Sequence, residues 1–292
     1  MATFNGVYSK VDIQFRKLLQ ELILPPKQHP RFDILELYHL TGVERGNFIV
    51  SLFKKFIEIN KLKVLDVGCG SGGVSIAFAK HGARVVSIDL NVNYTKITKV
   101  RACEEKVLLD VLNTDVCNSP FGDEEFDVLV CNDVVEHISE VNKFFSEIRR
   151  LLKSDGLIFI ETHNKWSPYI IFSDPHSGLP FVVLLPKRIA DPFVWRWSRI
   201  KNSLYYNATY LDFVKKLSKN GIEIFFVDLQ AYLKTAKTLP MHISPSSWVY
   251  RLLGRIVNLL APLIDFWTKN VYMKLFIPGW RLIGRKKAKN LK

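Results

Sequence analysis

A glycine-rich turn near residue 70 separates a short apolar run from a helical pattern. Its residues are Asp66-Val67-Gly68-Cys69-Gly70-Ser71-Gly72-Gly73. Glycines allow a tight turn and a close approach of the backbone to a ligand. The helix behind them presents free N–H groups and the positive end of its dipole. Asp89 follows 19 residues after Gly70, where a carboxylate can accept hydrogen bonds from both hydroxyls of a ribose. The spacing therefore predicts a nucleotide-like ligand.

Two sequence patterns match this turn. Gly68, Gly70 and Gly73 satisfy GxGxxG, which is typical of dinucleotide-binding proteins. Asp66, Gly68, Gly70 and Gly72 satisfy DxGxGxG, which is typical of S-adenosylmethionine (SAM) methyltransferases. Asp66 favours the second pattern, because a buried acid in that strand has no role in holding a pyrophosphate. Direct contact of Asp66 with the ligand and bracing of the loop amides both remain open.

Alternating strands and helices must position this turn. Short strands are expected in KVLDVG, RVVSID, KVLLDVLNTD, FDVLVCN, GLIFIETHN and IEIFFVD, with helices between them and GWRLIGRK as the last strand. This alternation predicts parallel βαβ units. We expect one domain, divided into N-terminal helices (1–60), a core (61–163), a cap insertion (164–203), core again (204–229), an amphipathic helical insertion (230–278), and a last strand with a basic tail (279–292).

Taken together, VLDVGCGSGG, Asp89, Asp115, CNDVVEHI and LLKSDGLIFIETHN resemble the class I SAM-dependent methyltransferases. The nearest resemblance is to the ubiquinone-biosynthesis O-methyltransferase type. It is dense over residues 48–163 and looser over 203–228. The resemblance implies a Rossmann-like α/β fold with a seven-stranded sheet whose last strand is antiparallel. Helical insertions are expected after strands five and six.

The resemblance also implies SAM as the cofactor and a role for each matching residue. The glycines would pack under the methionine portion. Leu90 and Val116 would flank the adenine, with Asp115 at its edge. Asn132 and Asp133 would face the amino-acid end of the cofactor. The expected cofactor-binding residues are Asp66, Gly68, Cys69, Gly70, Gly72, Asp89, Leu90, Asp115, Val116, Asn132 and Asp133.

Three histidines are candidates for a catalytic base. His137 follows strand four, His163 follows strand five, and His176 lies in the first insertion. A histidine with a pKa near neutrality suits proton abstraction from an oxygen nucleophile. The alternative for each is a structural histidine bonded to the backbone. No metal-ligand pattern of the catechol type is visible, so we expect no catalytic metal, although the resembling family sometimes uses a divalent ion.

Positive charge is concentrated in the second half of the chain. The formal net charge is +13 over 292 residues. Residues 1–161 carry 20 basic and 22 acidic side chains, whereas residues 162–292 carry 21 and 6. This asymmetry predicts an anionic partner for the second half, a membrane or a nucleic acid. A solvated basic face is the alternative.

Both insertions combine aromatic and basic residues. Trp166, Trp195 and Trp197 alternate with Lys187, Arg188 and Arg196 in the first. The stretch 248–269 of the second, taken as a helix, places its polar side chains on one narrow stripe. We expect an interfacial helix there, with a buried helix that covers the active site as the alternative.

The sequence therefore predicts an enzyme of the EC 2.1.1 class. The expected reaction is O-methylation of an amphiphilic or lipid-linked small molecule at the membrane surface. An RNA methyltransferase is one alternative, and a non-catalytic SAM-binding or membrane-scaffold protein is another. The four cysteines show no CxxC pair and the N-terminus has no signal-peptide pattern. We expect a cytoplasmic protein, peripheral on the inner membrane face.

Overall fold

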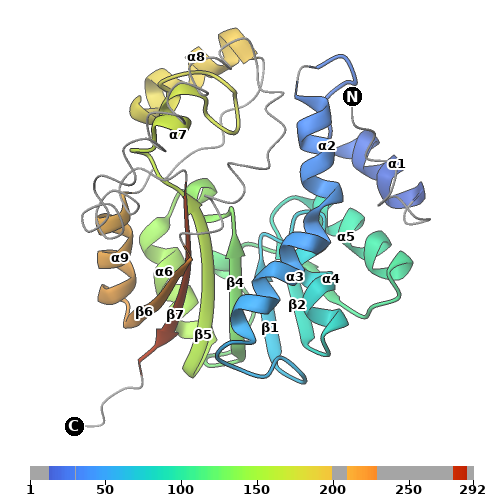
Figure 1. The fold of residues 1–292 in the computed structure, drawn as a ribbon, viewed down its shortest axis with the longest axis vertical. Coiled ribbons are helices and arrows are strands. Elements are labelled where there is room, and N and C mark those ends of the chain that lie inside the picture. The colour runs from blue at the N-terminus through green and yellow to red at the C-terminus, as the bar shows by residue number, and fades with distance from the viewer. Residues whose placement is uncertain (1–12, 30, 199–208, 229–278, 288–292) are drawn as a thin grey trace, which may run out of the picture. The chain divides into compact units, whose positions relative to one another are not determined.

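The computed structural model describes residues 13–29, 31–198, 209–228 and 279–287 (Figure 1). The predicted amphipathic stretch 248–269 and the basic tail from residue 288 on lie outside these residues. Among the described helices, none combines the length and apolar character that are needed to cross a membrane.

The described chain forms two compact units. Unit 1 covers the residues up to Cys131 together with Glu147–Phe159, and unit 2 covers Asn132–Ser146 and the residues from Ile160 to Lys287.

The first half of the chain contains most of the parallel strands. In chain order its elements are α1 (Ile13–Leu22), α2 (Phe32–Leu40), α3 (Gly42–Phe53), β1 (Lys63–Val67), α4 (Gly73–Lys80), β2 (Arg84–Asp89), α5 (Val92–Glu104), β3 (Asp110–Asn113), the 3₁₀ helix η1 (Val116–Asn118) and β4 (Phe126–Asn132). Helix α4 packs against β1 and β2, and α5 packs against β2 and β3.

The second half contains the expected last strands and the first insertion. Its elements are η2 (Val135–His137), α6 (Val141–Leu151), β5 (Leu152–His163), α7 (Pro168–Phe172), η3 (Val182–Leu184), α8 (Lys187–Ser198), α9 (Tyr210–Lys219), β6 (Ile222–Asp228) and β7 (Gly279–Lys286). The predictions FDVLVCN, IEIFFVD and GWRLIGRK coincide with β4, β6 and β7.

The strands form a seven-stranded sheet of order β3-β2-β1-β4-β5-β7-β6. Leu65 of β1 is paired in parallel with Val86 of β2 and with Leu129 of β4. Strands β6 and β7 are antiparallel. The predicted class I sheet and its antiparallel last strand are therefore confirmed. Strand β1 is almost entirely buried, as a strand with neighbours on both sides and helices on its faces must be.

The cap insertion contains helices that the sequence pattern does not reveal. Helix α7 has only five residues, begins with Pro168 at a position where no N–H is needed, and is too short to show a 3.6-residue period. Helix α8 contains Pro192 in its interior. Its inward face packs on η3 through Val182, Ala190 and Val194. Short elements joined by turns, rather than irregular chain, therefore form this part of unit 2.

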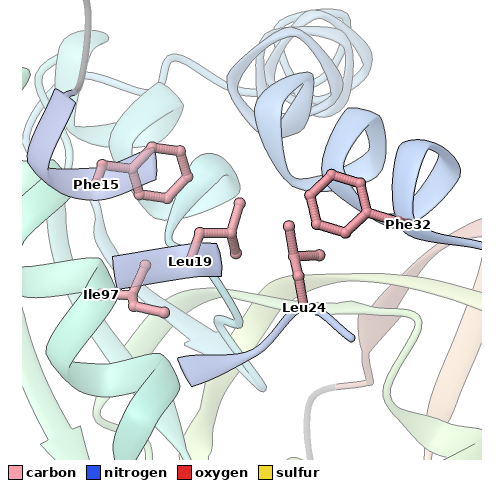
Figure 2. Packing of buried hydrophobic residues seen from close by; sticks show 5 residues of the cluster. All are labelled: Phe15, Leu19, Leu24, Phe32 and Ile97. Atoms are coloured by element: carbon pink, nitrogen blue, oxygen red, sulfur yellow. The ribbon is translucent and has the colours of Figure 1, made fainter. Parts of the chain in front are cut away.

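An apolar cluster fastens the N-terminal helices to unit 1. Phe15 and Leu19 of α1 meet Ile97 of α5, and Leu24 and Phe32 extend the contact toward α2 (Figure 2). Each of these side chains is buried, which is worth roughly 1.5–3 kcal/mol per residue relative to exposure. This packing holds α2 in place, and α2 carries a residue that touches the glycine-rich loop.

Candidate active site

The glycine-rich loop runs from the end of β1 into α4 with three left-handed residues. Gly68, Gly70 and Gly72 have φ angles of 67°, 51° and 77°. At Gly70 a Cβ atom would meet nothing within 4 Å, so the backbone there borders open space. At Gly73 a Cβ would lie 2.6 Å from the Cα of Gly42, so this glycine serves the close packing of α3 on α4. Gly70 thus borders open space, whereas Gly73 allows α3 and α4 to pack closely.

Asp89 ends β2 and ties that strand to the loop. Its Oδ2 accepts a hydrogen bond from the backbone N–H of Gly70 at 2.9 Å, and its Oδ1 accepts from that of Asn91 at 2.8 Å. A carboxylate oxygen can accept more than one hydrogen bond. The side chain is therefore held in one orientation beside the backbone of Gly70.

Asp66 is buried beneath the same loop, with an exposed fraction of 2%. Its Oδ2 accepts from the Ser75 hydroxyl at 2.5 Å, and Ser75 in turn accepts from the Ser87 hydroxyl at 2.8 Å. Burial raises the pKa of the Asp66 carboxyl to about 7, the nearby Asp89 charge adds to the rise, and the Ser75 bond opposes it. The side chain braces the first turn of α4, where the sequence pattern left open contact with the ligand or with loop amides.

Two residues that the sequence analysis did not single out, His39 and Arg101, hold the loop from the other side. His39 of α2 is buried, and its Nδ1 lies 3.1 Å from the Ser71 hydroxyl. Arg101 of α5 donates to the carbonyl oxygens of His39 at 3.1 Å and Ser71 at 3.3 Å. Burial lowers the pKa of His39 to about 4, and the Arg45 and Arg101 charges add to this. No local sequence pattern indicates these contacts, because α2, the loop and α5 are far apart in sequence.

The segment after β3 contains the expected adenine contacts. Asp115 begins η1, and its Oδ1 accepts from the backbone N–H of Cys117 at 2.9 Å. Val116 is buried, whereas Leu90, after β2, is 74% exposed. Asn113 connects the two strand ends, because its side-chain amide donates to the carbonyl oxygens of Asp89 and Leu90 at 2.8 and 2.9 Å.

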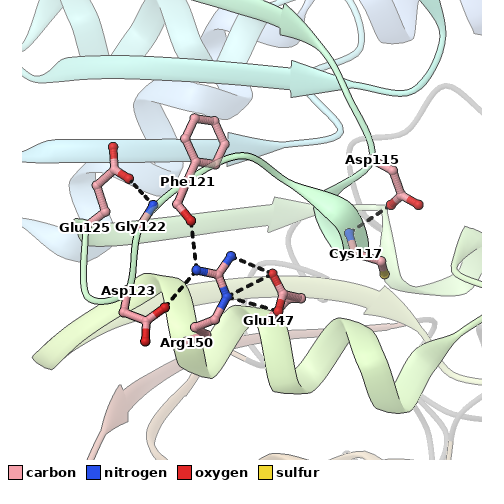
Figure 3. A network of polar contacts seen from close by, with 8 residues as sticks. All are labelled: Asp115, Cys117, Phe121, Gly122, Asp123, Glu125, Glu147 and Arg150. Atoms are coloured by element: carbon pink, nitrogen blue, oxygen red, sulfur yellow. Dashed lines mark hydrogen bonds and ion pairs between the residues drawn. The ribbon is translucent and has the colours of Figure 1, made fainter.

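An arginine of α6 anchors the loop that leads from η1 into β4. Arg150 donates to both oxygens of Glu147, to Asp123 and to the carbonyl oxygen of Phe121 (Figure 3). The Glu147 and Asp123 hydrogen bonds raise the pKa of this guanidinium above its ordinary value. The ion pairs fix the chain on the C-terminal side of Asp115.

Unit 2 contains the other predicted residues, and its first two are Asn132, which ends β4, and Asp133, which follows it. Asp133 has a left-handed φ of 55°, and its backbone N–H donates to the carbonyl oxygen of Glu161 at 3.1 Å. The side-chain amide of Asn132 donates to Asp133 Oδ2 at 3.0 Å.

The three predicted histidines gather around Glu136 within unit 2. Glu136 Oε1 lies 3.0 Å from His163 Nδ1, and its Oε2 accepts from the Thr162 hydroxyl at 3.1 Å. The ring centroid of His176 lies 4.8 Å from that of His137 and 5.3 Å from that of His163. Residues of η2, β5 and the cap loop therefore meet at one point.

Charge and burial act in opposite directions in this cluster. Burial by itself would lower the pKa of His163, but the Glu136 carboxylate outweighs it and raises that pKa. Conversely, burial would raise the pKa of Glu136, and the His163 charge lowers it. For His176, burial dominates and lowers the pKa. His163 and Glu136 thus form a charged pair beside the neutral imidazole of His176. Glu136, His163 and His176 also offer three ligand atoms that all lie within 4.8 Å of one another.

Comparison with known proteins identifies the fold and its cofactor. A family profile described as "Methyltransferase domain" matches residues 65–160, which include the glycine-rich loop, Asp89, Asp115 and the β4 end. Residues 65–160 therefore form a methyltransferase domain, and the strand order of the sheet is that of the class I SAM-dependent methyltransferases. The open space at Gly70 and the oriented carboxylate of Asp89 fit the cofactor of that family, S-adenosyl-L-methionine.

Curated relatives of the methyltransferase domain are ubiquinone biosynthesis O-methyltransferases. That of Histophilus somni is 34% identical over 143 residues, which are 46% of this chain and 58% of the relative. That of Haemophilus ducreyi is 36% identical over 140 residues, 44% of this chain and 55% of the relative. The chain spans about half the length of the curated relatives that it matches.

Solved structures show the same fold at low identity. An S-adenosylmethionine-dependent methyltransferase from Mesorhizobium loti has a TM-score of 0.52 and 16% identity, and the match covers 83% of this chain and 99% of that chain. The [4+2]-cyclase SpnF is also similar, with a TM-score of 0.52 and 18% identity over 83% of this chain and 81% of that chain. The fold is therefore shared by proteins of more than one reaction type.

Within the methyltransferase domain, the predicted cofactor residues up to Val116 lie in unit 1. Asn132 and Asp133 lie in unit 2 with all three histidines. Cys69 is buried, and burial raises the pKa of its thiol, so it serves as a packed apolar residue of the loop. The role of each residue toward the cofactor stays a prediction.

Proposed function

We propose that this protein is a SAM-dependent methyltransferase that methylates an oxygen atom of an amphiphilic or lipid-linked small molecule at the cytoplasmic face of a membrane. The observation that supports the cofactor most strongly is the pairing of Gly70 and Asp89. A glycine that borders open space stands beside a carboxylate whose two oxygens are both fixed by backbone amides.

The residues of unit 1 would hold the cofactor by its polar ends. Asp89 would accept from the ribose hydroxyls, and Asp115 from the adenine amino group, while Leu90 supplies an exposed apolar surface for the base. When bound, SAM supplies an electrophilic methyl group on a sulfonium. The contribution of the chain is then alignment of the acceptor and removal of its proton.

Substitution of Asp89 tests the cofactor assignment. We expect Asp89→Ala to weaken SAM binding at least about 100-fold, because charge-assisted hydrogen bonds to two hydroxyls are lost together. Isothermal titration of the purified chain measures it. Asp110→Ala, at the exposed start of β3, is the matched control and retains wild-type affinity. Equal affinity of Asp89→Ala and the wild type contradicts the assignment.

The histidine cluster supports oxygen as the accepting atom. A hydroxyl oxygen that forms a bond to the methyl carbon must give up its proton while the sulfur–carbon bond breaks, and a neutral imidazole can take that proton. His137, His163 and His176 converge within unit 2, and the Glu136 carboxylate would stabilise positive charge there. We assign the proton to this cluster.

Exposed aromatic side chains of the cap support an amphiphilic acceptor. Trp195 and Trp197 of α8 are 58% and 65% exposed, and Trp166 and Ile189 are also exposed. The guanidinium carbon of Arg196 lies 5.2 Å from the centroid of the Trp197 ring. Aromatic rings beside basic groups are typical of surfaces that rest in a lipid headgroup layer.

Vesicle flotation tests the membrane surface. We expect the full chain to float with vesicles that contain anionic phospholipid at low salt and to be released as salt is raised. The double variant Trp195→Ser, Trp197→Ser should reduce the floated fraction at least about tenfold. Phe225→Ser, at an exposed position of β6 in the same unit, is the control. A wild-type chain that stays in the soluble fraction at low salt contradicts the membrane proposal.

The same aromatic and basic residues also suit single-stranded RNA, which binds by stacking and phosphate contacts. Retention of labelled tRNA or rRNA at moderate salt would favour an RNA methyltransferase. The likeness to a cyclase keeps a protein without methyl transfer as a further candidate. Incubation with labelled SAM and a metabolite extract separates it, because methyl incorporation is expected only from a methyltransferase.

A further inference from the structure

The cluster of Glu136, His163 and His176 has the composition and spacing of a metal site. Its three ligand atoms lie within 4.8 Å of one another, and Glu136 Oε1 is 3.0 Å from His163 Nδ1. Ligands that bind one first-row ion at about 2.0–2.2 Å stand roughly 3–3.5 Å apart. One edge of the cluster already has this length, and the third ligand is within a short side-chain movement.

His176 lacks, among the described residues, the hydrogen-bond partners that a buried imidazole normally has. Its Nδ1 and Nε2 are both inaccessible to solvent, and neither has a hydrogen-bond partner among the described residues. A buried polar group without a partner costs about 1–3 kcal/mol. A neutral imidazole in this state can serve as a metal ligand.

The loop that carries His176 is built to hold it still. The backbone N–H and the hydroxyl of Ser177 donate to Asp174 Oδ2 at 2.5 and 2.6 Å, and Gly178 N–H donates to the Asp174 carbonyl at 2.7 Å. Asp174 and Ser177 are buried, although this loop connects α7 with η3. To hold an imidazole without a partner in a rigid, buried turn is energetically unfavourable unless the imidazole binds a ligand.

Glu136 is oriented in the same way. Its Oε2 accepts from the Thr162 hydroxyl, which leaves Oε1 to face His163. Hydrogen bonds from a neighbouring residue to a ligating carboxylate are typical of metal centres and set the direction of the free oxygen.

We propose that Glu136, His163 and His176 bind one divalent first-row transition-metal ion, of the class of Zn²⁺, Mn²⁺, Fe²⁺ or Co²⁺. Two imidazoles and one carboxylate select this class, since Mg²⁺ and Ca²⁺ prefer ligand sets of oxygen alone. Three protein ligands leave open coordination positions. This proposal replaces the expectation from the sequence that no metal is used.

The ion would act on the acceptor if the proposed function is correct. A hydroxyl bound to a divalent ion has a lowered pKa, so its proton would pass more easily to His137, which is not one of the proposed ligands, and its oxygen would become a better nucleophile at neutral pH. This role depends on the proposed function, whereas the binding of the ion does not.

Titration of the full chain with metal ions tests the site without SAM or acceptor. The protein is stripped with a chelator and dialysed, then titrated with Co²⁺ while its visible absorption is followed, and with Zn²⁺ by calorimetry. We expect one ion per chain with a dissociation constant in the micromolar range or below. His163→Gln and His176→Gln should each weaken binding at least about 100-fold. His81→Gln, at the end of α4 in unit 1, is the control and should bind as the wild type does.

Three outcomes overturn the proposal: no saturable binding, binding to His176→Gln equal to that of the wild type, or binding of Mg²⁺ alone. Because the His176 nitrogens bond to nothing in the described chain, His176→Gln should keep its circular dichroism spectrum, so lost binding reports a lost ligand. SAM affinity measured on the same stripped protein stays separate. A protein that binds SAM and no transition metal keeps the proposed function and loses this site.

Discussion

The glycine-rich loop of unit 1 and the histidine cluster of unit 2 differ in how their polar side chains are hydrogen-bonded. Asp66 and Asp89 both accept hydrogen bonds from neighbouring protein donors, and His39 has Ser71 as its partner. In unit 2, His176 has no hydrogen-bond partner among the described residues. Neighbouring protein donors thus fix the two carboxylates of the first region, whereas the second region holds an imidazole for which the described residues supply no hydrogen-bond partner.

The largest expected effect concerns the rigidity of unit 1. Gly73→Ala should destabilise the protein by more than about 3 kcal/mol, because the added Cβ meets the backbone of Gly42, which cannot yield. Gly70→Ala should cost only about 1–2 kcal/mol, since open space surrounds it and only its left-handed φ is strained. Urea unfolding measures both, and equal costs would show that the loop is not packed as described.

A second prediction uses the buried His39 of unit 1. Its pKa is about 4 in the folded state and about 6.5 in the unfolded chain, so the unfolded chain takes up the proton first as pH falls. The contribution of neutral His39 to the free energy of unfolding is therefore fully present above pH 6.5. It decreases by up to about 3 kcal/mol as the pH falls to 4.

His39→Gln lacks this loss, and the difference between the two proteins isolates it. Asp66 acts in the opposite direction, because its raised pKa favours folding as pH falls below 7. Both proteins retain Asp66, so its contribution cancels. Unfolding curves at pH 7 and pH 4.5 provide the measurement, and parallel pH profiles for the two proteins would rule out the buried, neutral state of His39.

A third prediction compares one histidine of each region directly. In metal-free buffer, His176→Leu should leave stability unchanged or raise it by about 1 kcal/mol, because no hydrogen bond is lost and a buried polar group is removed. His39→Leu should cost about 1–3 kcal/mol, because the Ser71 hydroxyl loses its partner. Chemical denaturation of both variants decides it. A clear loss in His176→Leu would mean that the histidine has a structural role.

The smallest expected effect belongs to an exposed ion pair of unit 1. Asp123 is 77% exposed beside Arg150, whereas Glu147 is 18% exposed and accepts hydrogen bonds from the same guanidinium with both of its carboxylate oxygens (Figure 3). Asp123→Asn should change stability by less than about 0.5 kcal/mol. Glu147→Gln should cost about 1 kcal/mol. Thermal unfolding measures the pair, and a large effect of Asp123→Asn would show that the loop before β4 depends on charge.

Local patterns predicted most of unit 1. The run KVLDVG, the glycines behind it and Asp89 lie within one βαβ unit, so a spacing of 19 residues suffices to indicate the loop, the helix and the carboxylate that meets Gly70. The cap was predicted less well. Helix α7 is too short to show a period, and Pro192 interrupts the pattern of α8.

The sequence by itself determined the class I sheet, the cofactor loop and the identity of the candidate histidines, because a strand, a turn and a helix are specified by neighbours in the chain. Only the tertiary structure decided that His39 supports the loop and that Glu136, His163 and His176 meet. Those contacts join residues between 13 and 40 positions apart in sequence. No periodicity or motif encodes such contacts, since they depend on how separate elements pack against one another.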